Sequence, residues 1–138
     1  MKIFAKIVLV VLVLTVAVAC QNKKADITPT ASLQSIYFDY DQAFIRSDAV
    51  PVMQGNASYL KANSSKSISI EGNCDNRGTN EYNLALGHRR SESAKNYLIN
   101  LGVAADKLKT MSYGEEKPVC FSNDENCWQK NRRDDFRD

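Results

Sequence analysis

The chain has 138 residues, which is enough for one domain, and it contains 18 basic and 16 acidic residues. The net charge of +2 falls to zero if a leader that carries Lys2 and Lys6 is removed, because 16 residues of each sign then remain. This balance leaves no basic surface of the kind that binds nucleic acid or an anionic membrane.

Residues 1–19 are predicted to be an export signal, because a basic start precedes an apolar run at residues 7–19 that is too short to span a bilayer. The tetrapeptide that ends at Cys20 resembles a bacterial lipobox, in which the signal is removed and the cysteine is acylated. An uncleaved membrane anchor and an unmodified cysteine are the alternatives.

The residues after Cys20 bear on where the protein resides. Gln21, rather than Asp, resembles the residue found in lipoproteins that are released to the outer membrane. We therefore expect a lipid anchor in the outer membrane, with the protein facing the periplasm. Residues 20–34 are assigned to the lipidated cysteine and a flexible polar linker, and residues 35–138 to the folded domain.

The folded domain opens with strand, helix and strand patterns. Residues 36–40 are rich in aromatic side chains, which favours a β-strand. Ser47 can cap a helix over residues 48–62, where apolar side chains recur at helical spacing. Residues 66–71 alternate between polar and apolar side chains, which predicts a strand with one apolar face.

A loop then leads into a long helix predicted for residues 81–101, which Gly102 should end. Residues 108–113 are predicted to form a third strand, and residues 124–133 a short helix. Residues 134–138 carry too many charges for a central strand, so we expect an edge strand or a frayed end there. The order β-α-β-α-β-α-β predicts an α/β (α+β) fold, with helices packed on a small mixed parallel and antiparallel sheet.

The junction between the loop and the long helix carries the most informative residues. Arg90 lies on the helix stripe that faces the core, where its charge must find acceptors. Asp75, fifteen positions earlier in the loop, is the nearest candidate by sequence, and Gly87 leaves space for a ligand beside Arg90. Opposite charges held at this spacing could bind a zwitterionic ligand. A structural salt bridge between Asp75 in the loop and Arg90 on the helix explains the same spacing equally well.

The spacing Asp75-x2-Gly78-x4-Asn83-x2-Leu86-x3-Arg90 resembles the OmpA-like peptidoglycan-binding domain family, and within it the peptidoglycan-associated lipoproteins. Further stretches that resemble the family lie at residues 37–41, 71–72, 77–79, 81–83, 112–118 and 131–133. The resemblance implies non-covalent binding of the peptidoglycan stem peptide at its diaminopimelate residue. It also implies that the protein tethers the outer membrane to the cell wall in a Tol-Pal-like system, with a TolB-like periplasmic protein as a further partner.

The resemblance also implies roles for individual residues. Arg90 would bind the ligand carboxylate with a bidentate fork that lysine cannot copy, and Asp75 would take the ammonium group. The remaining residues of the cleft would be Tyr40, Asp41, Gly78, Asn83 and Leu86. No catalytic residue, metal or cofactor is implied. Cys74 stands where the family usually has Thr or Ala.

Three cysteines remain for an oxidising compartment once Cys20 is acylated. Cys120 and Cys127 are the natural disulfide pair, which leaves Cys74 single. These spacings, with the lone His88, match no common zinc site. The rival function is a cell-wall peptide hydrolase that uses Cys74 and His88. We expect no enzyme, because His88 lies on a helix only fourteen residues later and has no evident orienting partner.

Overall fold

The computed structural model describes residues 32–138. The predicted export signal at residues 1–19, the acylated Cys20 and most of the predicted linker lie outside the described residues. Between residues 32 and 138, no helix is both long enough and apolar enough to cross a membrane.

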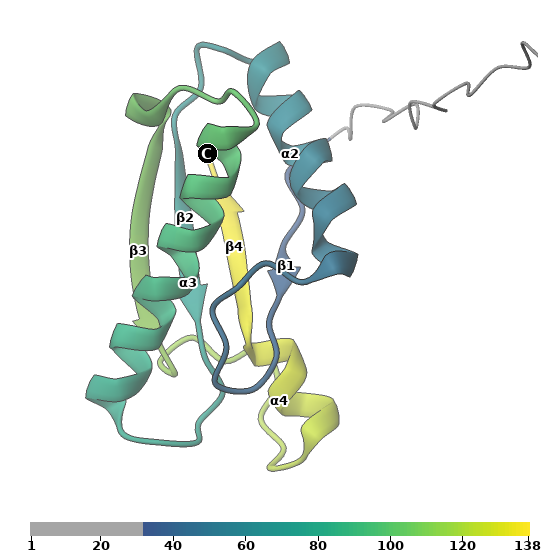
Figure 1. Cartoon of the computed structure of the whole chain (residues 1–138). Helices are drawn as coiled ribbons and strands as arrows, with labels where there is room; N and C mark the ends of the chain where they lie inside the picture. Colours follow the sequence, from purple (N-terminus) through teal and green to yellow (C-terminus); the bar gives the residue numbers. More distant parts are fainter. Residues whose placement is uncertain (1–31) are drawn as a thin grey trace, which may run out of the picture.

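Strands and helices alternate along the described chain (Figure 1). In order, they are β1 (Ile36–Tyr37), the 3-10 turn η1 (Ser47–Ala49), α2 (Val50–Ala62), β2 (Ile68–Asn73), α3 (Asn80–Asn100), the 3-10 turn η2 (Ala105–Lys107), β3 (Leu108–Gly114), α4 (Glu125–Asn131) and β4 (Arg133–Arg137). The predicted fold class is therefore confirmed. The predicted cap of α2 is wrong, because Ser47 begins η1 and its side chain caps neither η1 nor α2.

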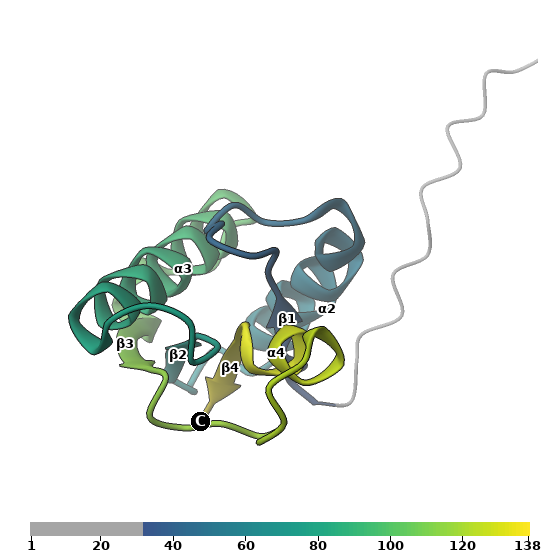
Figure 2. The ribbon, with the colours of Figure 1, turned by 90° about the horizontal axis from the view of Figure 1, so that it is seen from below.

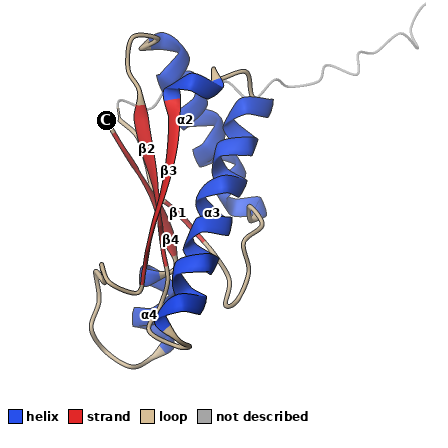
Figure 3. Cartoon of the chain, turned by 90° about the vertical axis from the view of Figure 1, so that its left-hand side faces the viewer, coloured by secondary structure: helices blue, strands red, loops and turns tan. Residues whose placement is uncertain are grey.

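The four strands form one mixed sheet in the order β1-β4-β2-β3. Strand β2 is parallel to β3, and β4 is antiparallel to both β1 and β2. Helices α2 and α3 lie against the same face of this sheet (Figure 3). The core between the two layers contains fully buried side chains such as Phe38, Met53, Ile70 and Leu98.

Strand β4 corrects the expectation for the end of the chain. We expected an edge strand or a frayed end, but β4 lies between β1 and β2. The reason is that its side chains alternate between the two faces of the sheet. Phe136 lies opposite Ile70 and joins the core. Arg133 and Asp135 form an ion pair of 3.0 Å on the other face, so these charges are neutralised in place.

Asp134 is the one charged side chain of β4 on the helix-covered face. Its register partners are Ile36 in β1 and Gly72 in β2, and it is 0% exposed. Neither carboxylate oxygen accepts a hydrogen bond from any residue between 32 and 138. Burial raises the pKa of Asp134 well above its ordinary value, and the charge of Arg90 only partly opposes that effect.

Helix α3 lies unusually close to β2 at a pair of glycines. A Cβ atom added to Gly72 would lie 1.9 Å from the carbonyl oxygen of Gly87, which leaves no room for a side chain. This contact fixes the position of α3 over the end of β2. Arg90, one helical turn after Gly87, is thereby placed beside the last residues of the strand.

Candidate ligand-binding site

The loop between β2 and α3 is shaped by two local features. Gly78 has a φ of +115°, a backbone conformation that side chains disfavour. Thr79 caps α3, because its Oγ1 accepts a hydrogen bond from the backbone N–H of Tyr82 at 3.2 Å. The loop therefore turns sharply and delivers α3 with its N-terminus beside the end of the sheet. Figure 2 shows this loop, the β1–α2 connection and α4 at the same end of the molecule.

A cavity of about 150 Å³ opens among these segments. Its lining residues are Tyr40, Asp41, Cys74, Asp75, Arg77, Gly78, Tyr82, Asn83, Leu86, Arg90 and Arg132. The structure thus brings together all seven cleft residues named from the sequence, although they come from distant parts of the chain.

Asp75 is the most heavily hydrogen-bonded carboxylate of the cavity and is only 4% exposed. It accepts bonds from Arg77 Nη2 at 2.7 Å and from Arg132 Nη1 at 3.1 Å. Burial acts to raise the pKa of Asp75, but the bonds from Arg77 and Arg132 outweigh it and lower the pKa. Within the described residues, Asp75 makes no ion pair with Arg90, so the alternative of a direct salt bridge between them is wrong.

Arg90 is 0% exposed and is held by backbone carbonyls. Its Nε donates to Gln42 at 2.8 Å, its Nη2 to Asp39 at 3.1 Å and its Nη1 to Asn73 at 2.9 Å. Nη1 also donates to Cys74 Sγ at 3.4 Å. A guanidinium has five N–H groups, so one on Nη2 remains for a ligand. A bidentate fork from Arg90 would require one of these protein bonds to break.

Sequence reasoning missed Arg77, which has the most accessible guanidinium of the cavity. It is stacked between the rings of Tyr40 and Trp128, each 4.1 Å from its Cζ. It also lies 3.5 Å from Glu125, and 29% of its side chain is exposed. The only sequence signal for a role of Arg77 is its position two residues after Asp75. Its stacking partner Trp128 lies on α4, far along the chain, so the sequence does not reveal their contact.

Arg132, which belongs to one of the stretches that resemble the family, is buried and lines the cavity. Its Nε donates to the backbone oxygen of Phe38 at 3.0 Å, and its two terminal nitrogens bond to Asp75 and Glu125. Arg132 therefore connects the residue that follows β1, the loop after β2 and α4, and it supplies Asp75 with a fixed countercharge.

The rest of the cavity wall combines polar and apolar groups. Asn83 is buried and donates through Nδ2 to Glu115 Oε2 at 2.6 Å. Tyr82 donates its hydroxyl hydrogen to Asp41, whose φ of +54° is rare for a residue other than glycine. Leu86 contributes a buried apolar surface. The site therefore offers carboxylates, guanidinium groups and an apolar wall within one small volume.

The arrangement of Cys74 and His88 argues against a cysteine hydrolase. Cys74 is buried, and burial raises the pKa of its thiol to about 11, so it stays protonated at neutral pH. Its Sγ donates to the backbone oxygen of Asn83. His88 is exposed on α3, and no hydrogen bond joins it to Cys74 within the described part of the chain.

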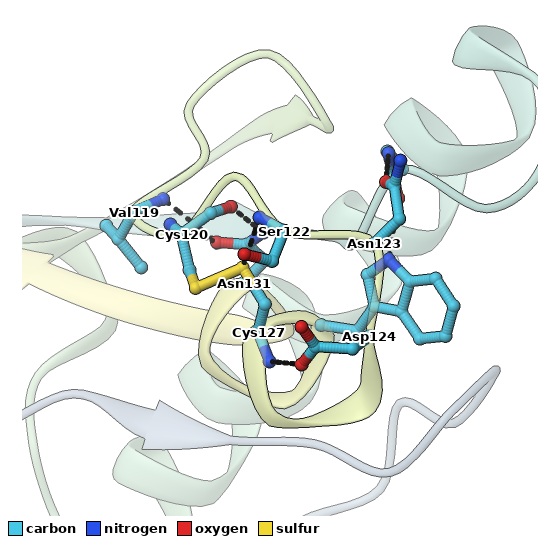
Figure 4. Close-up of a disulfide and its surroundings, with 9 residues drawn as sticks. Val119, Cys120, Ser122, Asn123, Asp124, Cys127 and Asn131 are labelled. Carbon is cyan, nitrogen blue, oxygen red and sulfur yellow. Dashed lines mark hydrogen bonds between the residues drawn. A yellow bond between two sulfur atoms is a disulfide. The ribbon is translucent and has the colours of Figure 1, made fainter.

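A disulfide joins Cys120 to Cys127, with sulfur atoms 2.13 Å apart (Figure 4). It connects the loop after β3 to the first turn of α4. Cys74 is the remaining cysteine of the described residues and is free. Between residues 32 and 138, no group of three or more His, Cys, Asp or Glu side chains is arranged to hold a metal ion.

Comparisons with known proteins agree with this architecture. The model of the OmpA family matches residues 37–133. The peptidoglycan-associated lipoprotein of Mesorhizobium japonicum is 47% identical over 98 residues, which are 71% of this chain but only 58% of that relative. The peptidoglycan-associated lipoprotein of Pseudomonas putida is 35% identical over 161 aligned positions, covering 97% of this chain and 96% of the relative.

A solved structure extends the likeness to three dimensions. The crystal structure of the peptidoglycan-associated lipoprotein from Burkholderia pseudomallei matches with a TM-score of 0.75 and 42% sequence identity. The match covers 80% of this chain and 92% of that one. Sequence, fold and the convergence of the cavity residues lead to one conclusion: this chain belongs to the OmpA family and is a relative of its peptidoglycan-associated lipoproteins.

Proposed function

We propose that this chain is an outer-membrane lipoprotein that binds peptidoglycan non-covalently through the diaminopimelate residue of the stem peptide. It would thereby tether the outer membrane to the cell wall as part of a Tol-Pal-like system. The observation that carries the proposal is the single cavity in which Asp41 and Asp75 lie together with three guanidinium groups. The relatives at 35–47% identity are named peptidoglycan-associated lipoproteins, which supports the wall-binding and lipoprotein parts of the proposal.

Diaminopimelate suits this cavity because its free end carries an ammonium and a carboxylate group on one carbon. Asp75 would accept the ammonium, and Arg77, displaced from Asp75, would bind the carboxylate with its planar fork. Arg77 can make this exchange because its side chain is partly exposed, whereas Arg90 and Arg132 are buried. Arg90 would add its remaining N–H and a fixed positive charge. The structure thus favours Arg77, rather than Arg90, as the bidentate group.

Replacing Asp75 with Asn should weaken binding to purified peptidoglycan at least thirtyfold, because the ligand ammonium loses its countercharge. The domain should stay folded, since Arg132 keeps its bonds to Glu125 and Phe38. Sedimentation of the residue 32–138 domain with purified cell wall would measure the change.

The matched control is Asp48→Asn. Asp48 is exposed and is paired with Arg46 at 2.8 Å, away from the cavity, so its replacement should leave retention unchanged. Normal retention of a folded Asp75→Asn variant would remove Asp75 from the site. Equal loss in both variants would point to a general charge effect.

The anchoring part of the proposal rests on the sequence around Cys20 and on the names of the relatives. Mass spectrometry of the mature protein is expected to find an N-terminus at an acylated Cys20. Fractionation should place this protein in the outer membrane, facing the periplasm, where a TolB-like protein could meet the cavity end of the domain. An unmodified Cys20, or retention of residues 1–19, would contradict the anchoring proposal.

A further inference from the structure

Trp128 is the only tryptophan of the chain, and it lies on α4, outside the lining of the ligand cavity. Its ring stacks on Arg77, with the ring centre 4.1 Å from the guanidinium carbon, and the ring of Tyr40 lies at the same distance from that carbon. Aromatic rings therefore cover the guanidinium on both faces. The group can move within its own plane, but the rings prevent it from tilting out of that plane.

The guanidinium held in this plane already binds a carboxylate. Arg77 Nε donates to Asp75 Oδ1 at 3.1 Å, and Arg77 Nη2 donates to Asp75 Oδ2 at 2.7 Å. These two bonds form the bidentate fork by which a guanidinium recognises a carboxylate. A ligand carboxylate that replaces Asp75 must enter the same plane, and a guanidinium that is already oriented loses less conformational freedom on binding. The orientation of Arg77 before binding therefore bears directly on ligand affinity.

Trp128 is itself held from two sides. Its Nε1 donates to Asn76 Oδ1 at 2.8 Å, so the indole contacts two consecutive residues of the loop between β2 and α3. The preceding residue, Cys127, is joined to Cys120 by the disulfide, and its backbone N–H donates to Asp124 Oδ1 at 3.1 Å (Figure 4). Helix α4 has only seven residues, too few for a helix that is stable alone, so these contacts fix the position of the ring.

We propose that Trp128 is a positioning residue for the stem peptide, because it keeps the Arg77 guanidinium in one plane while Arg77 exchanges Asp75 for the ligand carboxylate. This inference rests on the proposed function, since it needs Arg77 as the group that binds the carboxylate of the diamino acid. Trp128 acts through Arg77 and does not need to touch the ligand. The face of the ring carries this role, and the disulfide would still hold a ring that lacks the indole N–H.

Replacement of Trp128 by Leu and by Phe tests the inference, because both residues are apolar but only Phe offers an aromatic face. The test uses residues 20–138 with Cys20→Ser, so that no acyl chain is present. The probe is a synthetic tripeptide that ends in diaminopimelate and leaves the distal amino-acid end free. Isothermal titration calorimetry should show an affinity about three- to tenfold weaker for Trp128→Leu, the cost of ordering one free side chain. Trp128→Phe should keep the parent affinity.

Trp128 also provides an optical signal of its own, since no other tryptophan contributes to the fluorescence of the chain. The tripeptide should change the Trp128 emission of the parent protein, because Arg77 shifts beneath the ring when it leaves Asp75. The dissociation constant from this change should equal the one from calorimetry. Unchanged emission at a saturating concentration of tripeptide would contradict the exchange of partners by Arg77 and would overturn the inference.

Phe44→Leu is the matched control, because Phe44 is an exposed aromatic residue that does not line the ligand cavity, and it should keep the parent affinity. Melting temperatures would show that each variant is folded. Equal affinities of Trp128→Leu and the parent protein would overturn the inference, as would equal losses in Trp128→Leu and Trp128→Phe. Failure of the parent protein to bind either the tripeptide or purified peptidoglycan would instead refute the proposed function.

Discussion

Arg90→Lys is expected to destabilise the domain by roughly 2–5 kcal/mol, the usual cost of breaking a buried, hydrogen-bonded charge. Arg90 bonds to Asp39, Gln42 and Asn73 from three nitrogen atoms. A lysine has one nitrogen atom, which cannot reach all three carbonyls, so at least one carbonyl would be left buried without a donor. The conservative replacement should therefore behave as a core mutation.

The melting temperature provides the measurement. For a domain of about 100 residues, 1 kcal/mol corresponds to roughly 4–8 °C, so a fall of about 10 °C or more is expected. Arg89→Lys is the control, because the neighbouring Arg89 is exposed on α3 and should tolerate the change. An unchanged melting temperature for Arg90→Lys, with lost wall binding, would show that Arg90 serves the ligand alone.

Asp134→Ala is expected to stabilise the domain by roughly 1–3 kcal/mol at neutral pH. The Asp134 carboxylate is fully buried and accepts no hydrogen bond from the described residues, so its removal relieves a desolvation cost. Arg90 would lose a nearby negative charge, but its own acceptors are backbone carbonyls and stay in place. The stability gained by removing the buried Asp134 carboxylate should therefore exceed the stability lost when Arg90 no longer has that nearby charge.

The stabilisation of the domain by Asp134→Ala should increase with pH. The pKa of Asp134 is raised by burial in the folded protein, whereas the unfolded chain has the ordinary value of about 3.9. Folding therefore favours the protonated form, and stability is lost as the pH rises from about 4 through the raised pKa. Asp134→Ala removes this pH-dependent loss of stability. The difference in the free energy of unfolding between the variant and the parent protein should therefore grow with pH and become constant above the raised pKa. Urea unfolding at several pH values would measure it.

The adjacent residue supplies the control. Asp135 lies on the opposite face of β4, where it accepts bonds from Arg133 and from the Ser35 hydroxyl at 2.6 Å. Asp135→Ala should destabilise the domain, because Arg133 would be left buried without its carboxylate. Equal effects of the two replacements would contradict the assignment of opposite environments to these aspartates.

Much of the candidate site could be predicted because its elements are local. The loop that carries Asp75 and the helix that carries Arg90 are consecutive, so spacing alone places both residues at one junction. The partners of these residues could not be predicted in the same way. Arg90 bonds to Asp39, 51 positions earlier, and Asp75 to Arg132, 57 positions later. Such contacts depend on the sheet order, which local patterns do not specify.

The error at β4 has a related cause. Counting charges in residues 134–138 treats each side chain as equally exposed, whereas a central strand has two faces with separate environments. Arg133 and Asp135 neutralise each other on one face, and Phe136 supplies the apolar contact on the other. The pattern has the period of two typical of strands, and only Asp134 departs from the usual preference for apolar side chains on a covered face.

The direction of β1 determines how the domain would carry a mechanical load. The chain runs from Ser32 along β1 to the segment that borders the cavity (Figure 1). A pull on Ser32 against a ligand held in the cavity would therefore act along the strand. The bonds between β1 and β4, continued by Phe38 N–H to the Arg132 carbonyl at 2.9 Å, would be loaded in shear and would have to break together. Forced unfolding is governed by the unfolding rate, which should be low when several hydrogen bonds must break at the same time. The two-residue strand β1 should therefore resist tension along its length better than tension from the side, which would break its bonds one after another.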